Sequence, residues 1–257
     1  MINIKEAKNV FKKYVKNYNP EDGKIALKIG HILRVTEKSR EIAENLNLEA
    51  EDINLAELIG LLHDIGRFEQ VRIYNTFYDK DSINHGEYGV KILFEDNLIR
   101  KFIQDDCYDE IIKTAILNHN KPRIEEEGMT DRELMHAKII RDADKLDIYY
   151  TLLTEKLENS YGCTDMSKEK ITDEIYREFK ENHMINYKNL KTNADMLVAH
   201  IAYIFDFYYS YSLNIVKENK YIEKIENKVN LQDEQAIKYL QEINIIANKY
   251  IEESLKN

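Results

Sequence analysis

The run from Ile53 to Ile65 is the feature that most constrains this sequence, since it is too uniformly apolar for a helix at a surface. We therefore predict a helix in the core, with Gly66 placed to end it as a C-terminal cap. His63 and Asp64 stand near its end, where a buried imidazole and carboxylate need a partner or a metal to offset the loss of water. Both side chains are metal ligands, so the doublet predicts a metal site.

The scarcity of turn residues sets the fold class. Only 2 Pro and 8 Gly in 257 residues leave too few for the turns of a many-stranded protein. We expect an all-α fold with a helical bundle that holds the metal site over residues 1–160. Residues 161–257 should form a C-terminal helical extension packed on this core, and these C-terminal helices could carry an oligomer interface.

Charge and cysteine content narrow the class of partner. A formal net charge of -10 disfavours a nucleic-acid duplex or an acidic membrane as partner, but it leaves room for a small anionic ligand. Cys107 and Cys163 form no Cys-x-x-Cys pattern, so neither a disulfide framework nor a thiolate zinc site is indicated. The N-terminus lacks the apolar core of a signal peptide, and no apolar run reaches membrane-spanning length. We expect a cytoplasmic protein that contacts no membrane.

Apolar residues recur at helical spacing in several further segments. These segments are residues 1–18, Ile25–Leu46, His85–Phe94, Tyr108–His119, Leu134–Leu153 and Leu231–Leu255. The segment Phe68–Asp79 has no sustained period, so we expect a loop near the end of the core helix. It is either an ordered surface loop or a lid whose aromatic rings stack on a base or sugar.

Further histidines fall at core-facing or early positions of the predicted helices. His31 lies between Ile29 and Ile32, His85 lies in a first turn, and His119 continues the apolar face of its helix. His183 and His200 have no acidic partner at ligand spacing and are expected to be structural.

The helix over Leu134–Leu153 contains several acidic residues. On a helical wheel Asp144 and Asp147 lie about 60° apart on the apolar side, whereas Asp142 points well away. The wheel favours the first two but does not choose between them.

The ordered set of histidines and aspartates resembles the HD-domain superfamily of metal-dependent phosphohydrolases. The resemblance covers about residues 25–155 and is carried by Gly30-His31, Leu61–Arg67, His85-Gly86-Glu87, Leu117-Asn118-His119 and Ala143–Asp147. It implies an α-helical bundle with metals at its centre. The four-ligand pattern of the family is matched by His31, His63, Asp64 and Asp144, which favours Asp144 over Asp147. The resemblance further implies that His85 and His119 belong to the two-metal branch, in which Asp64 bridges the ions.

The implied chemistry is phosphoryl transfer to water. Two divalent cations about 3.5–4 Å apart acidify a water and clamp a phosphoryl group, with Asp64 orienting the nucleophile. Arg67 stands where that branch often has a Lys directed at the substrate phosphate, and it adds a bidentate fork. Lys121, Arg123 and Lys145 are further candidates for binding the phosphate. Histidine ligation suits Fe, Mn, Co, Ni or Zn better than Mg.

We therefore expect a phosphomonoesterase or phosphodiesterase that acts on a small phosphorylated molecule, with a nucleotide as the favoured class. The same ligand set also resembles the di-iron oxygenases of the superfamily, including the myo-inositol oxygenase type. A cyclic-dinucleotide phosphodiesterase of the HD-GYP type is disfavoured, because Asn120-Lys121-Pro122 replaces the Gly-Tyr-Pro signature. The non-enzymatic alternative is a nucleotide-binding sensor, which the complete ligand set disfavours.

Overall fold

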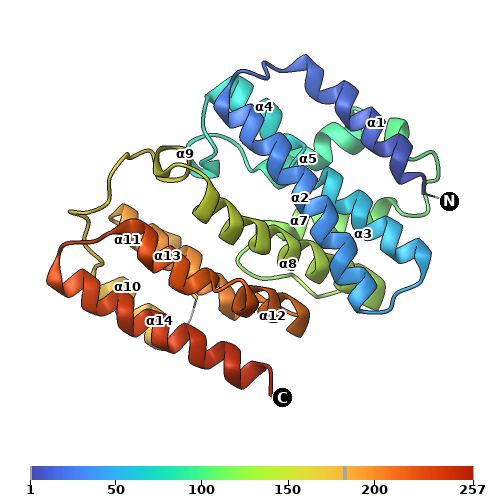
Figure 1. Ribbon diagram of the computed structural model, residues 1–257. Helices are drawn as coiled ribbons and strands as arrows, with labels where there is room; N and C mark the ends of the chain where they lie inside the picture. The colour runs from blue at the N-terminus through green and yellow to red at the C-terminus, as the bar shows by residue number, and fades with distance from the viewer. Residues whose placement is uncertain (1, 182–183, 257) are drawn as a thin grey trace. The chain divides into compact units, whose positions relative to one another are not determined.

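The computed structural model describes residues 2–181 and 184–256, and every regular element in those ranges is helical (Figure 1). The prediction of an all-α fold is confirmed. The chain divides into two compact units, Met1–Asp147 and Ile148–Asn257. The predicted division at residue 160 stays a prediction. Within the described ranges, none of the helices combines the length and apolar character that a membrane span requires.

All the candidate site residues lie in the first unit. The elements of this unit are α1 (Ile4–Tyr14), the 3-10 turn η1 (Val15–Asn17), α2 (Gly23–Asn45), α3 (Ala50–Leu62), α4 (Gly66–Tyr74), the 3-10 turn η2 (Asp79–Asp81), α5 (His85–Val90), the π-helical turn η3 (Lys91–Glu95), α6 (Ile99–Phe102), α7 (Asp109–His119) and α8 (Asp131–Thr154). Most of the candidate site residues are on these helices or in the short connections between helices, whereas Lys121 and Arg123 lie in the longer connection between α7 and α8. Helix α8 continues past the end of the first unit.

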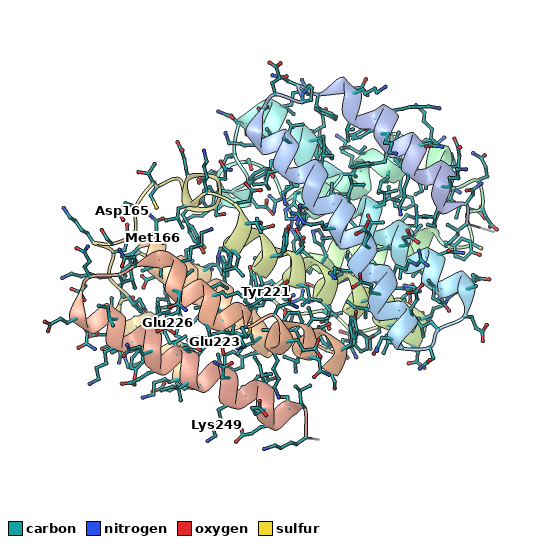
Figure 2. The ribbon with its side chains drawn as sticks, in the orientation of Figure 1. Asp165, Met166, Tyr221, Glu223, Glu226 and Lys249 are labelled. Atoms are coloured by element: carbon teal, nitrogen blue, oxygen red, sulfur yellow. The ribbon has the colours of Figure 1, made fainter. Side chains whose placement is uncertain are left out.

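The second unit is also helical, and the predicted helix over Leu231–Leu255 is confirmed as its last element. Its elements are α9 (Leu157–Tyr161), α10 (Asp173–Glu181), the 3-10 turn η4 (Tyr187–Asn189), α11 (Asn193–Ile201), the 3-10 turn η5 (Ala202–Asp206), α12 (Ser210–Glu218), α13 (Tyr221–Val229) and α14 (Glu234–Ser254). Met166 and Tyr221 are buried here, whereas Asp165 and Lys249 are exposed (Figure 2).

Helix α3 is the centre of the first unit, as its apolar sequence predicts. All its residues from Leu55 to Leu62 are buried, and burying one leucine side chain contributes about 1.5–3 kcal/mol. Helix α2 packs against it over a long contact (Figure 1). A Cβ added at Gly60 would lie 2.9 Å from the Cα of Thr36, so glycine lets the two backbones approach closely. This approach brings His31 on α2 next to the end of α3.

Gly66 does not end the core helix, and the prediction of a C-terminal cap is wrong. Helix α3 ends at Leu62, and Gly66 is the first residue of α4. A Cβ added at Gly66 would lie 2.3 Å from the carbonyl oxygen of His85 and 2.8 Å from the amide nitrogen of Gly89. Glycine is therefore required here by the close approach of α5, which a pattern within one helix does not reveal.

The segment after Arg67 is also helical where a loop was predicted. Helix α4 covers Gly66–Tyr74, and the loop begins at Asn75, whose left-handed backbone (φ 52°) ends the helix. The buried face of α4 includes Gln70, which is fully buried. This polar residue in an inward position interrupts the apolar period and explains the wrong prediction.

We expect Gly66→Ala to destabilise the protein by about 1–3 kcal/mol, because backbone atoms of α5 occupy the space that a methyl group needs. Gly23→Ala is the matched control, since Gly23 is the first residue of α2 and has no atom within 4 Å of an added Cβ. Urea unfolding of the two variants measures the difference. A Gly66→Ala protein as stable as Gly23→Ala would contradict this account of the α4–α5 contact.

Candidate metal centre

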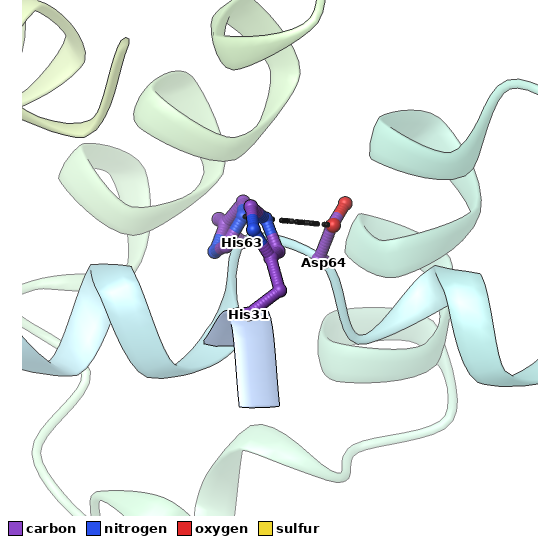
Figure 3. A group of neighbouring side chains, drawn as sticks. All are labelled: His31, His63 and Asp64. Carbon is purple, nitrogen blue, oxygen red and sulfur yellow. Dashed lines mark hydrogen bonds and ion pairs between the residues drawn. The ribbon is translucent and has the colours of Figure 1, made fainter. Parts of the chain in front are cut away.

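Four histidines and one aspartate converge in the first unit. His31 comes from α2, His63 caps the end of α3, His85 starts α5, and His119 ends α7. All four side chains are buried, as is Asp64, which lies in the short connection between α3 and α4. Figure 3 shows His31, His63 and Asp64 gathered where their three segments meet. The structure thus brings together residues that are far apart in the sequence.

The convergent residues form two clusters that share Asp64. Asp64 Oδ2 lies 3.5 Å from His31 Nε2 and 3.6 Å from His63 Nε2. Asp64 Oδ1 lies 3.4 Å from His85 Nε2 and 3.6 Å from His119 Nε2. Each carboxylate oxygen therefore faces a different pair of imidazoles, which is the arrangement of a carboxylate that bridges two cations. The two buried clusters are consistent with a binuclear metal site.

The other ring nitrogen of each histidine is already bound, which fixes the tautomer. The partners of the Nδ1 atoms are Asp147 Oδ2 for His31 (2.7 Å), the Gly60 carbonyl for His63 (2.8 Å), Asp79 Oδ2 for His85 (2.6 Å) and the Ile116 carbonyl for His119 (2.6 Å). A carbonyl oxygen only accepts, so Nδ1 donates to it, and a carboxylate favours the same direction. Each Nε2 then presents a lone pair to the shared centre, as a metal ligand must.

The spacing of these lone pairs fits divalent cations. His31 Nε2 and His63 Nε2 are 3.3 Å apart, and His85 Nε2 and His119 Nε2 are 3.0 Å apart. Two lone pairs cannot hydrogen-bond to each other, whereas metal–nitrogen bonds of about 2.0–2.1 Å place neighbouring ligand atoms about 3.0–3.4 Å apart. Asp64 Oδ1 is buried without a hydrogen-bond partner. A pair of cations would satisfy all five groups.

The buried environment keeps His63 and His85 neutral and Asp64 charged, as metal binding needs, whereas at His31 the carboxylates of Asp144 and Asp147 outweigh burial and raise the pKa. Burial lowers the pKa of His63 to about 4, and burial reinforced by Arg67 lowers the pKa of His85 to about 3. Both rings are therefore neutral at pH 7. Burial alone would raise the pKa of Asp64, but the neighbouring cations Lys28 and Arg67 help to hold that pKa well below its usual value. The shared carboxylate is ionised.

Asp144 and Asp147 lie on opposite sides of His31. Asp144 Oδ1 is 3.1 Å from His31 Nε2 and 3.8 Å from His63 Nε2, so it joins the nitrogens that face the centre. Asp147 instead accepts a hydrogen bond from His31 Nδ1. Its carboxylate also accepts hydrogen bonds from Arg34 Nε (2.5 Å) and Nη2 (3.0 Å). Asp144 therefore lies on the side of His31 that faces the first cluster, whereas Asp147 hydrogen-bonds the opposite ring nitrogen, and the role of Asp144 as a fourth ligand stays a prediction.

Asp142, which the helical wheel places away from Asp144 and Asp147, is also fully buried. Its neighbours Arg141, Ala143 and Lys145 are buried as well. A helical wheel assumes one buried face, and this part of α8 is buried on several.

Arg67 lies beside the shared carboxylate. Its Nη1 donates to Gln70 Oε1 (2.7 Å), the Phe77 carbonyl (2.7 Å) and Asp79 Oδ1 (2.9 Å). Its Nε is buried, has no hydrogen-bond partner, and lies 3.5 Å from Asp64 Oδ1. One edge of the guanidinium is thus held by surrounding residues, and the edge that carries Nε turns towards the centre.

The other predicted phosphate-binding cations lie in different surroundings. Lys121 Nζ donates to Glu125 Oε2 (2.5 Å), Arg123 is exposed, and Lys145 is buried. Their part in substrate binding stays a prediction. His200 Nδ1 lies 3.1 Å from the Tyr161 hydroxyl in the second unit, and His183 lies outside the described residues.

Sequence reasoning missed several residues that complete the centre. Lys28 Nζ donates to Asp64 Oδ2 at 2.6 Å, Asp79 orients His85, and Gln70 donates to Asp79 Oδ1 at 2.9 Å. Lys28 could have been found, because it precedes His31 by one helical turn and shares its face. Asp79 lies in a connection without periodicity, so no local signal marks it.

Comparison with known proteins agrees with this geometry. Residues 29–149 match the family model described as HD domain. No curated protein and no solved structure matches the chain. The matched range includes all six predicted metal ligands, and the resemblance drawn from the sequence is confirmed. Residues 29–149 are therefore identified as an HD domain, and they hold two buried histidine–aspartate clusters that share Asp64.

Proposed function

We propose that the protein hydrolyses the phosphoester of a small phosphorylated molecule, with nucleotides as the favoured class. This proposal rests on the position of the Asp64 carboxylate, because its two oxygens face two separate pairs of imidazole nitrogens. The match of residues 29–149 to the HD-domain model supports the same reaction. The cationic Arg67 next to this carboxylate supports an anionic substrate.

The ligand atoms divide into two sets in this proposal. His31, His63, Asp64 and Asp144 would hold one cation, and Asp64, His85 and His119 would hold the other. When bound, the two cations supply an acidified water and neutralise the charge of the phosphoryl group. Imidazole donors favour Fe, Mn, Co, Ni or Zn for these positions.

The remaining polar residues orient these groups and the substrate. Asp147 and Asp79 accept from the Nδ1 atoms of His31 and His85, which keeps both Nε2 lone pairs directed at the centre. Asp64 orients the nucleophilic water. Arg67 donates its free edge to a phosphate oxygen, where a planar fork suits two hydrogen bonds.

Phosphate release without oxygen tests the reaction class. Protein purified without chelator, supplied with Mn(II) or Fe(II) in an oxygen-free chamber, should release phosphate from at least one member of a set of nucleotides and small phosphoesters. Hydrolysis needs only water, whereas an oxygenase of the same superfamily consumes oxygen as it forms product. Activity that appears only with oxygen, without phosphate release, would place the protein in the oxygenase branch.

Arg67→Ala should lower kcat/KM for the phosphorylated substrate about 10- to 100-fold, because it removes about 1.5–3 kcal/mol of charged hydrogen bonding. The loss should be partial, since the metal ligands stay in place and metal content should not change. Arg72→Ala is the control: Arg72 lies on the same helix, is exposed, and pairs with Glu69. Equal kinetics for the two variants would exclude Arg67 from substrate binding.

A further inference from the structure

A second cation, Lys28, lies on the side of Asp64 away from Arg67. Lys28 Nζ is 2.6 Å from Asp64 Oδ2, while Arg67 Nε is 3.5 Å from Asp64 Oδ1. The two side chains come from different helices, α2 and α4, and keep 13% and 15% of their surface exposed. Each oxygen of the shared carboxylate therefore has one cation beside it.

Both cations also meet one aromatic ring. Lys28 Nζ lies 5.3 Å and Arg67 Cζ 5.7 Å from the centroid of the Phe77 ring. Cations at this distance from a ring are attracted to its face, but the ring accepts no conventional hydrogen bond. The contacts with Asp64 and Phe77 thus place Lys28 and Arg67 around one common region next to the candidate metal centre.

Lys28 lacks a second acceptor for its three N–H groups. Within residues 2–181 and 184–256, the ammonium has Asp64 Oδ2 as its one hydrogen-bond partner. That oxygen also faces His31 and His63, so in the proposed reaction it serves as a ligand atom. An ammonium group is strongly hydrated and costly to leave unpaired in a partly buried place. An anionic oxygen of the substrate is the acceptor that would restore its pairing.

We propose that Lys28 is a substrate-binding residue which, together with Arg67, holds one terminal oxygen of a phosphomonoester and makes the site prefer monoesters over diesters. The inference rests on the proposed function. A phosphomonoester carries a charge of about −1.5 to −2 and three terminal oxygens that accept hydrogen bonds. A phosphodiester carries one negative charge and two such oxygens. If each cation of the centre takes one terminal oxygen, only the monoester would keep a further terminal oxygen for the Lys28–Arg67 pair.

The kinetic test compares Lys28→Met with Lys24→Met on metal-loaded protein. Lys24 lies one helical turn earlier on α2, and its ammonium donates to Asn75 Oδ1 (3.0 Å) and not to a residue of either cluster. Lys28→Met should lower kcat/KM for a monoester about 10- to 100-fold. The loss for a matched diester should be at least about tenfold smaller than the loss for the monoester. Lys24→Met should behave as wild type, and Lys28→Arg should recover part of the monoester activity.

A binding measurement separates this inference from the proposed function. Titration of the metal-loaded protein with inorganic phosphate should give a Kd at least tenfold weaker for Lys28→Met than for Lys24→Met, with equal metal content in both. This result supports anion binding by Lys28 even if no phosphoester is hydrolysed, in which case only the proposed function fails. Unchanged phosphate affinity, an equal loss for monoester and diester, or loss of metal from Lys28→Met would each overturn the inference.

Discussion

Replacing Asp64 with asparagine should empty the metal centre and abolish phosphoester turnover. The wild-type protein, purified gently and resupplied with metal, should bind about two equivalents of transition metal per chain. Asp64→Asn should fall below one equivalent, because both clusters lose the charged carboxylate that they share. The rate should drop by at least about a thousandfold, since the bound cations supply several kcal/mol of the catalysis.

Asp52→Asn is the control for this experiment. Asp52 lies on α3, the helix that leads to His63 and Asp64, but it belongs to neither cluster. Its carboxylate accepts hydrogen bonds from His136 Nε2 (2.9 Å) and Arg132 Nε (2.7 Å). The Asp52→Asn protein should keep both equivalents of metal even if it is less stable than the wild type. A wild-type chain that never exceeds one equivalent, or an Asp64→Asn chain that retains two, would contradict a bridging carboxylate.

The parts of the centre that depend on one helix could be predicted from the sequence. The apolar run before His63 and the face of the helix that ends at His119 placed both residues in the core. Their orientation is also local. Each donates Nδ1 to the carbonyl three residues earlier, Gly60 or Ile116, near a helix end where carbonyls lack a helical partner.

The parts that depend on contacts between distant segments could not be predicted in this way. Each cluster holds a second histidine whose Nδ1 is bound by a carboxylate, Asp147 for His31 and Asp79 for His85. Helical periodicity placed Asp144 and Asp147 together on one side, and only tertiary contacts separate the ligand position from the orienting one. The family resemblance favoured Asp144, whose Oδ1 lies 3.1 Å from His31 Nε2, and its role as a ligand stays a prediction.

Misjudged elements have the same physical origin. Gly66 is required by the close approach of the α5 backbone, and the sequence pattern placed this glycine at the end of a helix when it is the first residue of α4. Helix α4 was not predicted because the polar residue Gln70 occupies a buried position. Its Nε2 donates hydrogen bonds there to Asp79 Oδ1 and Ser82 Oγ. Buried polar residues of this kind position the residues around a site, and they also break the apolar patterns by which helices are found.

The two clusters should differ in affinity, and removing a histidine from the smaller one should remove one metal. The first cluster presents four protein ligand atoms, counting Asp144, and the second presents three, from His85, His119 and Asp64. His85→Ala would leave the second cation two protein ligands. We therefore expect metal content to fall from about two equivalents to about one, with the fold retained.

The rate of phosphoester hydrolysis should fall about 100- to 1000-fold in both His85→Ala and His119→Ala, because one remaining cation would not clamp the phosphoryl group from both sides. Elemental analysis and circular dichroism on the same samples measure metal content and fold. His200→Ala is the control, since His200 lies in the second unit with Tyr161 as its partner. If His200→Ala lost metal while His85→Ala kept two equivalents, the second cation would have to be held by residues outside the Asp64, His85 and His119 cluster.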